Sequence, residues 1–473
     1  ITKLIASLVE NNPELAKKKI LIIDDEADSG SVGFKGKREQ EELLETSKKL
    51  SQLRTKLDHA YFLQVTATPY SLYLQPTEIA VNSGVYKPVR PTFTEILEPF
   101  EGDIGGKIYF EDSEDVDSPA YHIHIRASGD DINTLKSKKM DTRILKNVAT
   151  TSKLLVFRKA IENFIVSVAI RRAQENKLND NLGKKVEAYQ LGKYACILHL
   201  DTAKTKMVWQ ESLVSSYLDY LKLEWGNNKA EAKKRYETHF NDDFKLSLQK
   251  AFDVKWIQYV PTFKEVEDII DEIFNLEDYQ IYVINSDQKI IDLTDEDGQL
   301  KLDTALNFFV GGQVLDRGIT INNLLSFFYG RDPMVSQMDT VLQHARMYGN
   351  RSKEDLTVTR MYTTERIFNR MKEIHQIDET LREFLIKNPE HEIVLLQESN
   401  GAVRPTSPNK IRIGNIITLR SYKTSYPYGF ETHNKTDLKK ITLSLDKYLR
   451  YIDGYSDKAR QSFKINTTQF SEI

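Results

Sequence analysis

The 473-residue chain has a single cysteine, Cys196, so no disulfide can form within it. Sparse cysteine is typical of proteins from a reducing cytoplasm. The chain has no apolar run near the roughly 18 residues that a membrane span needs, and no visible signal peptide. The sequence therefore predicts a cytoplasmic protein without a membrane segment. Its length predicts about two to four domains.

A glycine-rich loop that ends in Gly-Lys-Ser or Gly-Lys-Thr is also missing from the sequence. Such a loop cradles nucleotide phosphates in many hydrolases. Four Gly-Lys pairs occur, but none is followed by Ser or Thr: 36–37, 106–107, 183–184 and 192–193. The sequence thus excludes a phosphate loop of this kind within the chain itself.

The most informative segment that is present is Leu21-Ile22-Ile23 followed by Asp24-Asp25-Glu26-Ala27-Asp28. The apolar residues predict a short buried strand, and the carboxylates fall where that strand ends. Ligands of open parallel sheets bind at the carboxyl ends of the strands. One acid there can hold Mg²⁺ while its neighbour orients or deprotonates the water that attacks a nucleotide. A solvated acidic loop is the simpler alternative.

Three later segments complete a recognisable set. Tyr61–Val65 precedes a Thr-Ala-Thr-Pro turn that contains Thr66 and Thr68, and Asn307–Gly312 leads into Leu315-Asp316-Arg317-Gly318-Ile319-Thr320. The third segment, 339–351, has the pattern Asp-Thr-x-x-Gln-x-x-Arg-x-x-Gly-x-Arg. The set resembles motifs two, three, five and six of the superfamily-two helicases. In its details it looks like the Z-one domain family, described as proposed endonucleases with helicase-like cores, often encoded beside restriction or phage-defence genes.

The resemblance implies a role for each motif residue, ATP and Mg²⁺ being the cofactors. It assigns Asp25 to Mg²⁺ and Glu26 to water activation. Asp28 would anchor the turn or signal to the third motif, where Thr66 and Thr68 would couple nucleotide state to the lobe interface. Capping of a strand-end turn is the alternative for these threonines. In the second half of the chain the assigned residues are Arg317, Gly318, Gln343, Arg346 and Arg351.

Arg346 and Arg351 are candidate arginine fingers, which stabilise charge on the transferring phosphoryl group. They lie five residues apart with Gly349 between them, unlike the usual helicase spacing of three. We favour Arg351 as the finger, with Arg346 and Gln343 as supporting contacts. Arg317 and Gly318 would face nucleotide and nucleic-acid backbone, a surface salt bridge being the alternative for Arg317.

We expect an α/β fold with two RecA-like lobes built on parallel sheets, helical insertions and a C-terminal extension. The first lobe is expected to be incomplete at its N-terminus, with the phosphate loop upstream of Ile1; an ATPase that has lost the loop is the alternative. A helix over Glu39–Leu57 would cross over to the Thr66–Pro69 strand. Farther along, a capping box at Thr262–Glu265 predicts the start of a helix through Phe274, and a late strand is expected over Leu356–Thr363. The expected divisions are a partial first lobe, an insertion on its rim, a connecting helix, a second lobe and the extension: 1–95, 96–150, 151–190, 191–400 and 401–473.

The C-terminal extension differs from the body in charge. Residues 401–473 carry 13 Lys or Arg against 6 Asp or Glu, although the whole chain has a net charge of -3. Phosphates could contact the basic residues, and unpaired bases could stack on tyrosines. A small packed domain would explain the aromatics equally well. The candidate nucleic-acid contacts are Arg412, Arg420, Lys423, Tyr426 and Tyr428.

Two further patterns lead to weaker expectations. His122 and His124 form a His-x-His on the alternating stretch 121–126, which we interpret as a half-exposed strand, because no second cluster with metal-ligand spacing accompanies it. The sequence also has no convincing restriction-type nuclease motif.

Taken with the resemblance, the motifs predict an ATP-dependent DNA motor that acts in restriction or phage defence with other subunits. The alternative is a helicase-like module that binds or cuts DNA without ATPase activity of its own.

Overall fold

The computed structural model describes 17–30, 59–73, 91–98, 102–201, 203–284, 299–311, 323–333, 336–344 and 349–388, with pieces of at most five residues elsewhere. The chain divides into two compact units, Ile1–Ile416 and Ile417–Ile473. Only 439–440 and 442–443 of the second unit are described. Of the expected helix over Glu39–Leu57, most residues lie outside the described parts.

The predicted acidic strand is present as β1 (Lys19–Asp25), which pairs in parallel with β4 (His59–Val65). The register joins Lys19 to His59 and Asp25 to Val65, so both strands end at the same edge. The expectation that the apolar run forms a buried strand is wrong, because exposed and half-buried residues alternate along each strand and Leu21 and Ile23 are 59% and 62% exposed. The half-buried residues Ile20, Ile22 and Ala60 pack against Leu53 and Leu57. This pairing confirms the parallel pair of strands that the sequence predicted.

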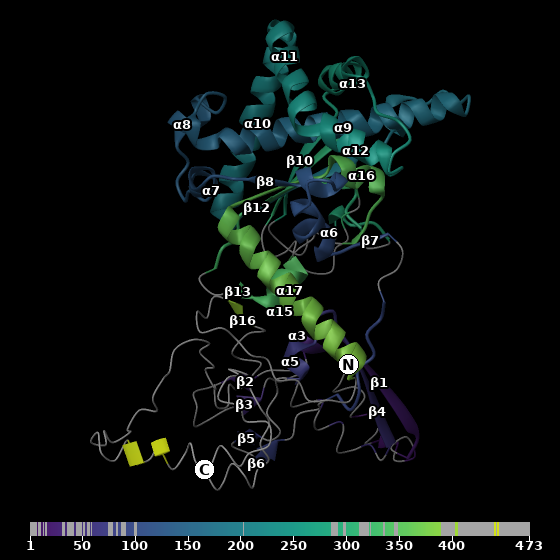
Figure 1. The fold of residues 1–473 in the computed structure, drawn as a ribbon, viewed down its shortest axis with the longest axis vertical. Helices are drawn as coiled ribbons and strands as arrows, with labels where there is room; N and C mark the ends of the chain where they lie inside the picture. Colours follow the sequence, from purple (N-terminus) through teal and green to yellow (C-terminus); the bar gives the residue numbers. More distant parts are fainter. Residues whose placement is uncertain are drawn as a thin grey trace. The chain divides into compact units, whose positions relative to one another are not determined.

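A six-stranded sheet with all its strands parallel organises the rest of the first unit (Figure 1). Its order is β10-β11-β9-β12-β15-β8. The central strands are apolar and buried along their whole length, as expected for a sheet that is covered on both faces. Their bounds are β8 (His124–Arg126), β9 (Tyr194–His199), β10 (Tyr279–Ile284), β11 (Leu306–Gly311), β12 (Leu324–Tyr329) and β15 (Arg360–Thr363).

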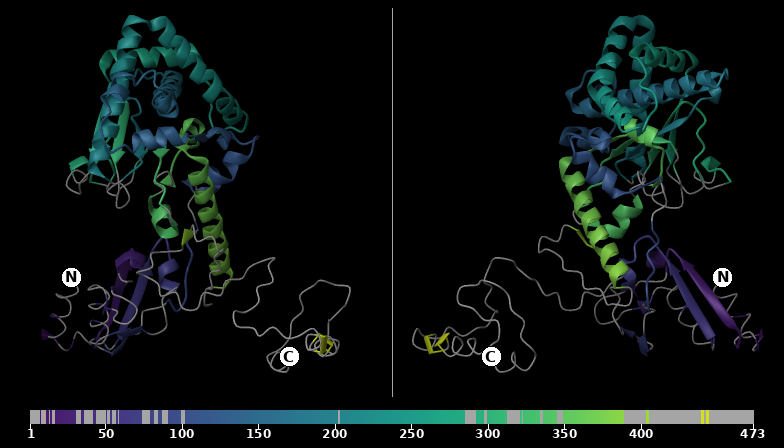
Figure 2. Two further views of the ribbon diagram at one scale, coloured as in Figure 1. Left: turned by 90° about the vertical axis from the view of Figure 1, so that its left-hand side faces the viewer. Right: turned by 45° about the vertical axis from the view of Figure 1, so that its right-hand side comes forward.

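Helices pack on both faces of this sheet, which makes a three-layer α/β fold. Alternate residues of β9 show the two faces: Cys196 and Leu198 belong to one apolar cluster, Ala195 and Ile197 to the other. The first cluster contains the helices α7 (Gly129–Leu135), α9 (Leu155–Asn181), α10 (Lys204–Asn227), α11 (Lys229–His239), α12 (Lys245–Asp253) and α13 (Phe263–Leu276). The second contains α6 (Gly106–Phe110), α15 (Met338–His344) and α17 (Glu365–Lys387). Figure 2 presents these helical groups from two further sides.

Local sequence explains where the main helices begin. Thr262 accepts the backbone N–H of Glu265, and the Glu265 carboxylate accepts the N–H of Thr262, so α13 has the predicted capping box. Thr364 caps α17 in the same way through the N–H of Ile367. The helical insertion after β9 is confirmed too, as α10, α11 and α12 with a π-helical turn at Phe240–Phe244.

Three expectations from the sequence need correction. The segment 96–150, expected as an insertion on the first lobe, contributes β8 to the edge of the six-stranded sheet. The apolar stretch expected to connect the lobes is α9, whose side chains form much of the core under that sheet. The late strand expected over Leu356–Thr363 is divided: Ser352 caps a short helix, α16 (Lys353–Val358), and only β15 is extended.

The remaining described elements are short. They are α3 (Ala27–Gly30), β2 (Phe34–Lys35), β3 (Glu42–Leu43), α5 (Tyr70–Tyr73), β5 (Ile79–Val81), β6 (Gly84–Tyr86), β7 (Asp103–Ile104), α8 (Thr142–Lys146), β13 (Ser336–Gln337), β14 (Gly349–Asn350), β16 (Val403–Arg404) and 3-10 turns that include Asp112–Glu114 and Pro119–His122.

Candidate functional site

The acidic turn after β1 separates its carboxylates into exposed and buried groups. Asp25 is the last residue of the strand, and both Asp25 and Glu26 are exposed at the edge of the sheet. Glu26 has a left-handed backbone with φ 53°, and its N–H donates a 3.0 Å hydrogen bond to the Asp25 carboxylate. A left-handed conformation costs an ordinary residue about 1–2 kcal/mol. Strain of this kind often accompanies functional sites, where it holds a side chain in a required direction.

Asp28 turns the other way and is completely buried. Its carboxylate accepts hydrogen bonds from the hydroxyls of Thr66, at 2.7 Å, and Thr68, at 3.1 Å. The hydroxyl of Thr66 in turn accepts the backbone N–H of Thr68 at 3.0 Å. The structure therefore joins the acidic turn to the Thr-Ala-Thr-Pro turn, as the sequence predicted for Asp28.

The exposed pair fits a Mg²⁺–nucleotide better than a protein-built metal site. Among the described residues no group of three or more His, Cys, Asp or Glu side chains is placed to hold a metal. Mg²⁺ in nucleotide sites commonly takes only one or two carboxylates, and phosphates and water supply its other ligands. Asp25 and Glu26 offer such a set of oxygen donors, and Asp25 can hold the ion while Glu26 orients water.

The structure contradicts the expectation that Arg351 is an exposed arginine finger. Its side chain is only 6% exposed, and Nη1 donates to the hydroxyl of Tyr109 at 3.0 Å and to the carbonyl of Leu324 at 3.1 Å. These contacts fix the guanidinium inside the body that carries the six-stranded sheet. In this conformation Arg351 stabilises packing and cannot reach across a cleft to a phosphate.

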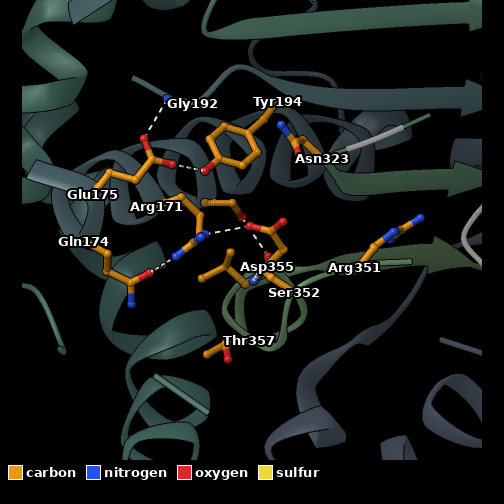
Figure 3. Close-up of polar contacts among 12 residues, drawn as sticks. Arg171, Gln174, Glu175, Gly192, Tyr194, Asn323, Arg351, Ser352, Asp355 and Thr357 are labelled. Atoms are coloured by element: carbon orange, nitrogen blue, oxygen red, sulfur yellow. Dashed lines mark hydrogen bonds and ion pairs between the residues drawn. The ribbon is translucent and has the colours of Figure 1, made fainter. Parts of the chain in front are cut away.

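The residues that follow Arg351 also have structural roles (Figure 3). Ser352 caps α16 by accepting the N–H of Asp355, and the Asp355 carboxylate pairs with Arg171 of α9 at 2.7 Å. Nearby, Glu175 accepts the hydroxyl of Tyr194 at 2.5 Å. In Figure 3 the Arg351 side chain extends away from this group. The segment that follows Arg351 thus joins α16 to α9.

Several predicted site residues lie outside the described parts: Arg317, Gly318, Arg346, Arg412, Arg420, Lys423, Tyr426 and Tyr428. Gln343 lies in α15. The structure brings together Asp25, Glu26, Asp28, Thr66 and Thr68, and it gives Arg351 a separate environment.

Sequence reasoning missed a buried polar cluster centred on Glu162 of α9. Its carboxylate accepts the hydroxyl of Tyr217, lies 2.5 Å from Nε2 of His239 and 3.2 Å from Nε of Arg235. His239 also contacts Asp243 at 3.1 Å. Hydrogen bonds to Asp243 and Glu162 outweigh burial and raise the pKa of His239. These residues come from three separate segments of the helical layer, so no spacing in the sequence reveals the cluster.

The His-x-His pattern has a different structure from the one expected. His122 ends a 3-10 turn, and only His124 lies in a strand, β8. Burial, with the charges of Arg360 and Lys250, lowers the pKa of His122 to about 4. Both rings border a cavity beside β8 and β15.

In the described parts of the chain no helix has the length and apolar character that a membrane crossing requires. No curated protein and no solved structure matches the chain. A family model, the Z1 domain, matches residues 156–403, which contain every strand of the six-stranded sheet except β8. Because this match covers more than half of the 473 residues, the chain belongs to the Z1 (Z-one) domain family.

Proposed function

We propose that the chain is part of an ATP-dependent motor that translocates on DNA or remodels it, with Mg²⁺-ATP bound at the edge of β1 and β4. Asp25 would hold the metal ion, and Glu26 would orient and deprotonate the attacking water. The chain would act in restriction or phage defence together with other subunits. This last part rests on the family resemblance alone.

The observation that carries the proposal is the pair of hydrogen bonds from Thr66 and Thr68 to Asp28. They join the strand end that carries the exposed acids to the end of the neighbouring parallel strand. A shift of Asp25 or Glu26 on nucleotide hydrolysis would therefore move the Thr-Ala-Thr-Pro turn as well. A direct link of this type is what a motor needs in order to transmit its nucleotide state.

A second function is favoured by one observation, the burial of Arg351 against Tyr109 and Leu324. An enzyme whose expected finger is fixed in the protein interior lacks one source of transition-state stabilisation. The second candidate is therefore a helicase-like module that binds or cuts DNA without hydrolysing ATP itself. The two candidates differ in one measurable property, DNA-stimulated ATPase activity.

The test is an ATPase assay of the full-length protein with and without duplex and single-stranded DNA. We expect Mg²⁺-dependent turnover that DNA stimulates and that Glu26→Gln lowers by about 10²–10⁴-fold. Glu26→Gln should retain Mg²⁺-ATP binding, whereas Asp25→Asn should weaken it. Asp219→Asn, at an exposed position of α10, serves as the control. An undiminished rate in Glu26→Gln would refute the assignment, and absence of turnover with retained DNA binding would favour the second function.

A further inference from the structure

A cavity of about 480 Å³ lies at the β8 edge of the six-stranded sheet, and none of its lining residues belongs to the acidic turn. Strands β8 and β15, the start of α17 and the two 3-10 turns at 112–122 surround it. Its volume falls within the range of small-molecule pockets, about 300–1,000 Å³. Its lining is unusual because it combines His122 and His124 with a buried arginine, Arg360.

Arg360 is a buried cation that other parts of the protein hold only through neutral groups. Its side chain is 1% exposed, and it donates to the carbonyls of Thr357, Thr359 and Asp243 and to the hydroxyl of Ser247. It also lies 4.3 Å from the ring centre of Phe244. No described carboxylate forms an ion pair with it, and its Nε has no hydrogen-bond partner among the described residues. A buried charge without a counterion is costly unless something neutralises it.

The carboxylates around the cavity are already occupied by other cations. Glu114 pairs with Lys372 and Glu365 with Arg126, and Asp243 pairs with Lys159 at 2.7 Å and with His239. Lys250 reaches the carbonyl of Val116 and the ring of Tyr121. Because these acids pair with other cations, no described carboxylate lies at ion-pair distance from Arg360, and the charge of Asp243 acts on it only from farther away.

The histidines add hydrogen-bonding groups without partners. Nε2 of His122 and Nε2 of His124 are buried and have no partner among the described residues. The His124 ring stacks on Phe368 with centroids 4.0 Å apart and contacts the backbone of Thr363, which fixes its orientation. Such fixed, unsatisfied polar atoms beside a cation are what a bound oxyanion would satisfy.

We propose that this cavity binds the phosphate group of a small phosphorylated molecule, with Arg360 as the charged partner and His122 as a hydrogen-bond donor. His124 joins the contact when it is protonated. The volume exceeds what phosphate alone needs, and the half-exposed ring of Tyr121 offers a surface for the rest of the ligand. A metal site is disfavoured, since the described residues contain no group of three ligands.

Electrostatics give this binding a pH dependence. Burial and the neighbouring cations Arg360 and Lys250 outweigh the opposing charge of Asp243 and lower the pKa of His122 to about 4, so its ring is neutral at pH 7. A bound dianion would offset the positive charges of Arg360 and Lys250 and so raise the pKa of His122. Binding and protonation therefore support each other, and affinity should increase as the pH falls. Sulfate suits this test, because its charge stays constant over the range in which phosphate itself titrates.

The experiment is calorimetric titration of the purified full chain with inorganic phosphate, adenosine 5′-monophosphate and adenosine. Saturable binding of phosphate and the nucleotide, but not of adenosine, is expected. His122→Asn should weaken that binding about tenfold or more, which is the loss expected for one hydrogen bond to a charged group. It should also flatten the pH dependence of sulfate binding. His59→Asn, at an exposed position of β4, is the matched control and should bind as the wild type does.

Comparing inorganic phosphate with adenosine 5′-monophosphate shows whether the site prefers free phosphate or a phosphate attached to a small molecule. Tighter binding of the nucleotide identifies an organic phosphate, and equal binding identifies free phosphate. Arg360 donates hydrogen bonds to three carbonyls, so Arg360→Lys is tested only if circular dichroism shows that the variant folds. A folded Arg360→Lys variant should bind the phosphate probes more weakly although the positive charge is retained. The proposal is overturned if no phosphate-bearing probe binds at concentrations up to about 10 mM. It is also overturned if His122→Asn folds and binds every probe as the wild type does.

Discussion

The hydroxyl of Thr66 donates a 2.7 Å hydrogen bond to the buried carboxylate of Asp28, which lies 38 residues earlier in the chain. The bond crosses between the ends of two parallel strands, and Thr68 adds a second one to the other carboxylate oxygen. Asp28 therefore works as an anchor that holds both turns, while Asp25 and Glu26 stay accessible at the edge. Within one run of acids, the fold separates a structural carboxylate from the candidate catalytic ones.

This arrangement predicts strong energetic coupling between Asp28 and Thr66. Asp28→Ala leaves two hydroxyls without their acceptor and should lower the free energy of unfolding by about 2–3 kcal/mol. Thr66→Val should recover part of the loss in the Asp28→Ala background, with a coupling energy of about 0.5–3 kcal/mol. Urea unfolding of the two single mutants and the double mutant measures this. Additive losses would show that the bond contributes little, and Asp219→Ala should change stability by less than about 0.5 kcal/mol.

The left-handed backbone of Glu26 leads to an opposite effect on stability. Glycine adopts φ near +50° without the steric cost that a side chain incurs. Glu26→Gly should therefore raise the free energy of unfolding by up to about 1 kcal/mol, while it removes the proposed water-activating carboxylate. Glu26→Ala also removes the carboxylate but keeps the strained backbone. The difference in melting temperature between Glu26→Gly and Glu26→Ala therefore measures the contribution of the backbone strain. Equal melting temperatures for the two variants would contradict a strained turn.

The sequence was most informative where a local pattern determines a local structure. Three apolar β-formers followed by acids predicted β1 and its parallel partner, and the Thr262–Glu265 box predicted the start of α13. The link from Asp28 to the threonine turn followed from the motif resemblance. In each case the deciding residues are within a few positions of each other, or belong to strands that pair directly.

Features that depend on tertiary packing were not predictable in this way. Arg351 fits a finger motif by its spacing, but its partners, Tyr109 and Leu324, come from distant segments. Leu356–Val358 have strand-forming residues, yet the cap at Ser352 makes them part of a helix. The polar cluster at Glu162 and the cavity at Arg360 likewise assemble from segments far apart in the sequence, and a single sequence carries no signal for such contacts.

Because Arg351 is buried, mutating it can distinguish a role in stabilising the fold from a role in catalysis. Arg351→Met removes the guanidinium that donates to the carbonyl of Leu324 and to the hydroxyl of Tyr109, and should lower the free energy of unfolding by about 2–3 kcal/mol. Tyr109→Phe removes only one of these contacts and should cost less. Denaturant titration of both variants measures the effect. A stable Arg351→Met protein that has lost only ATPase activity would restore the finger assignment.

The His239 cluster predicts that stability falls as the pH rises above 6.5. Although burial favours the neutral ring, hydrogen bonds to Asp243 and Glu162 raise the pKa of His239 above its ordinary value of 6.5. A group whose pKa is raised by folding stabilises the protein fully below 6.5, and that contribution disappears as the pH rises through the folded-state pKa. The free energy of unfolding should therefore fall over this window.

His239→Gln should remove this pH dependence and lower stability at about pH 6. Asp243 behaves in the opposite sense: burial is outweighed by its bonds to His239 and Lys159, which lower its pKa to about 2. Its contribution should be present above pH 3.8 and disappear as the pH falls towards 2. Urea midpoints measured across pH separate the two effects, and His59→Gln should follow the wild-type curve. A His239→Gln variant that keeps the wild-type loss of stability above pH 6.5 would contradict the assignment.

The basic extension leads to the last prediction, which rests on the sequence. If residues 401–473 bind a nucleic-acid backbone, each phosphate contact releases counterions, and affinity should fall steeply as salt rises. Replacing Arg412, Arg420 and Lys423 by Ala should then weaken binding similarly on all sequences and flatten the salt dependence. Tyr426→Ala and Tyr428→Ala should reduce single-stranded binding more than duplex binding, because only unpaired bases offer free faces for stacking.

A small packed domain predicts a different pattern for the same five residues. The tyrosine substitutions would then lower the melting temperature, since each removes a large core side chain, and the three basic substitutions would have little effect. Fluorescence anisotropy with labelled single-stranded and duplex DNA at several salt concentrations, combined with thermal unfolding, measures both properties in each variant. Unchanged DNA affinity in all of them would exclude the extension as a nucleic-acid contact and leave DNA binding, where it occurs, to the α/β body.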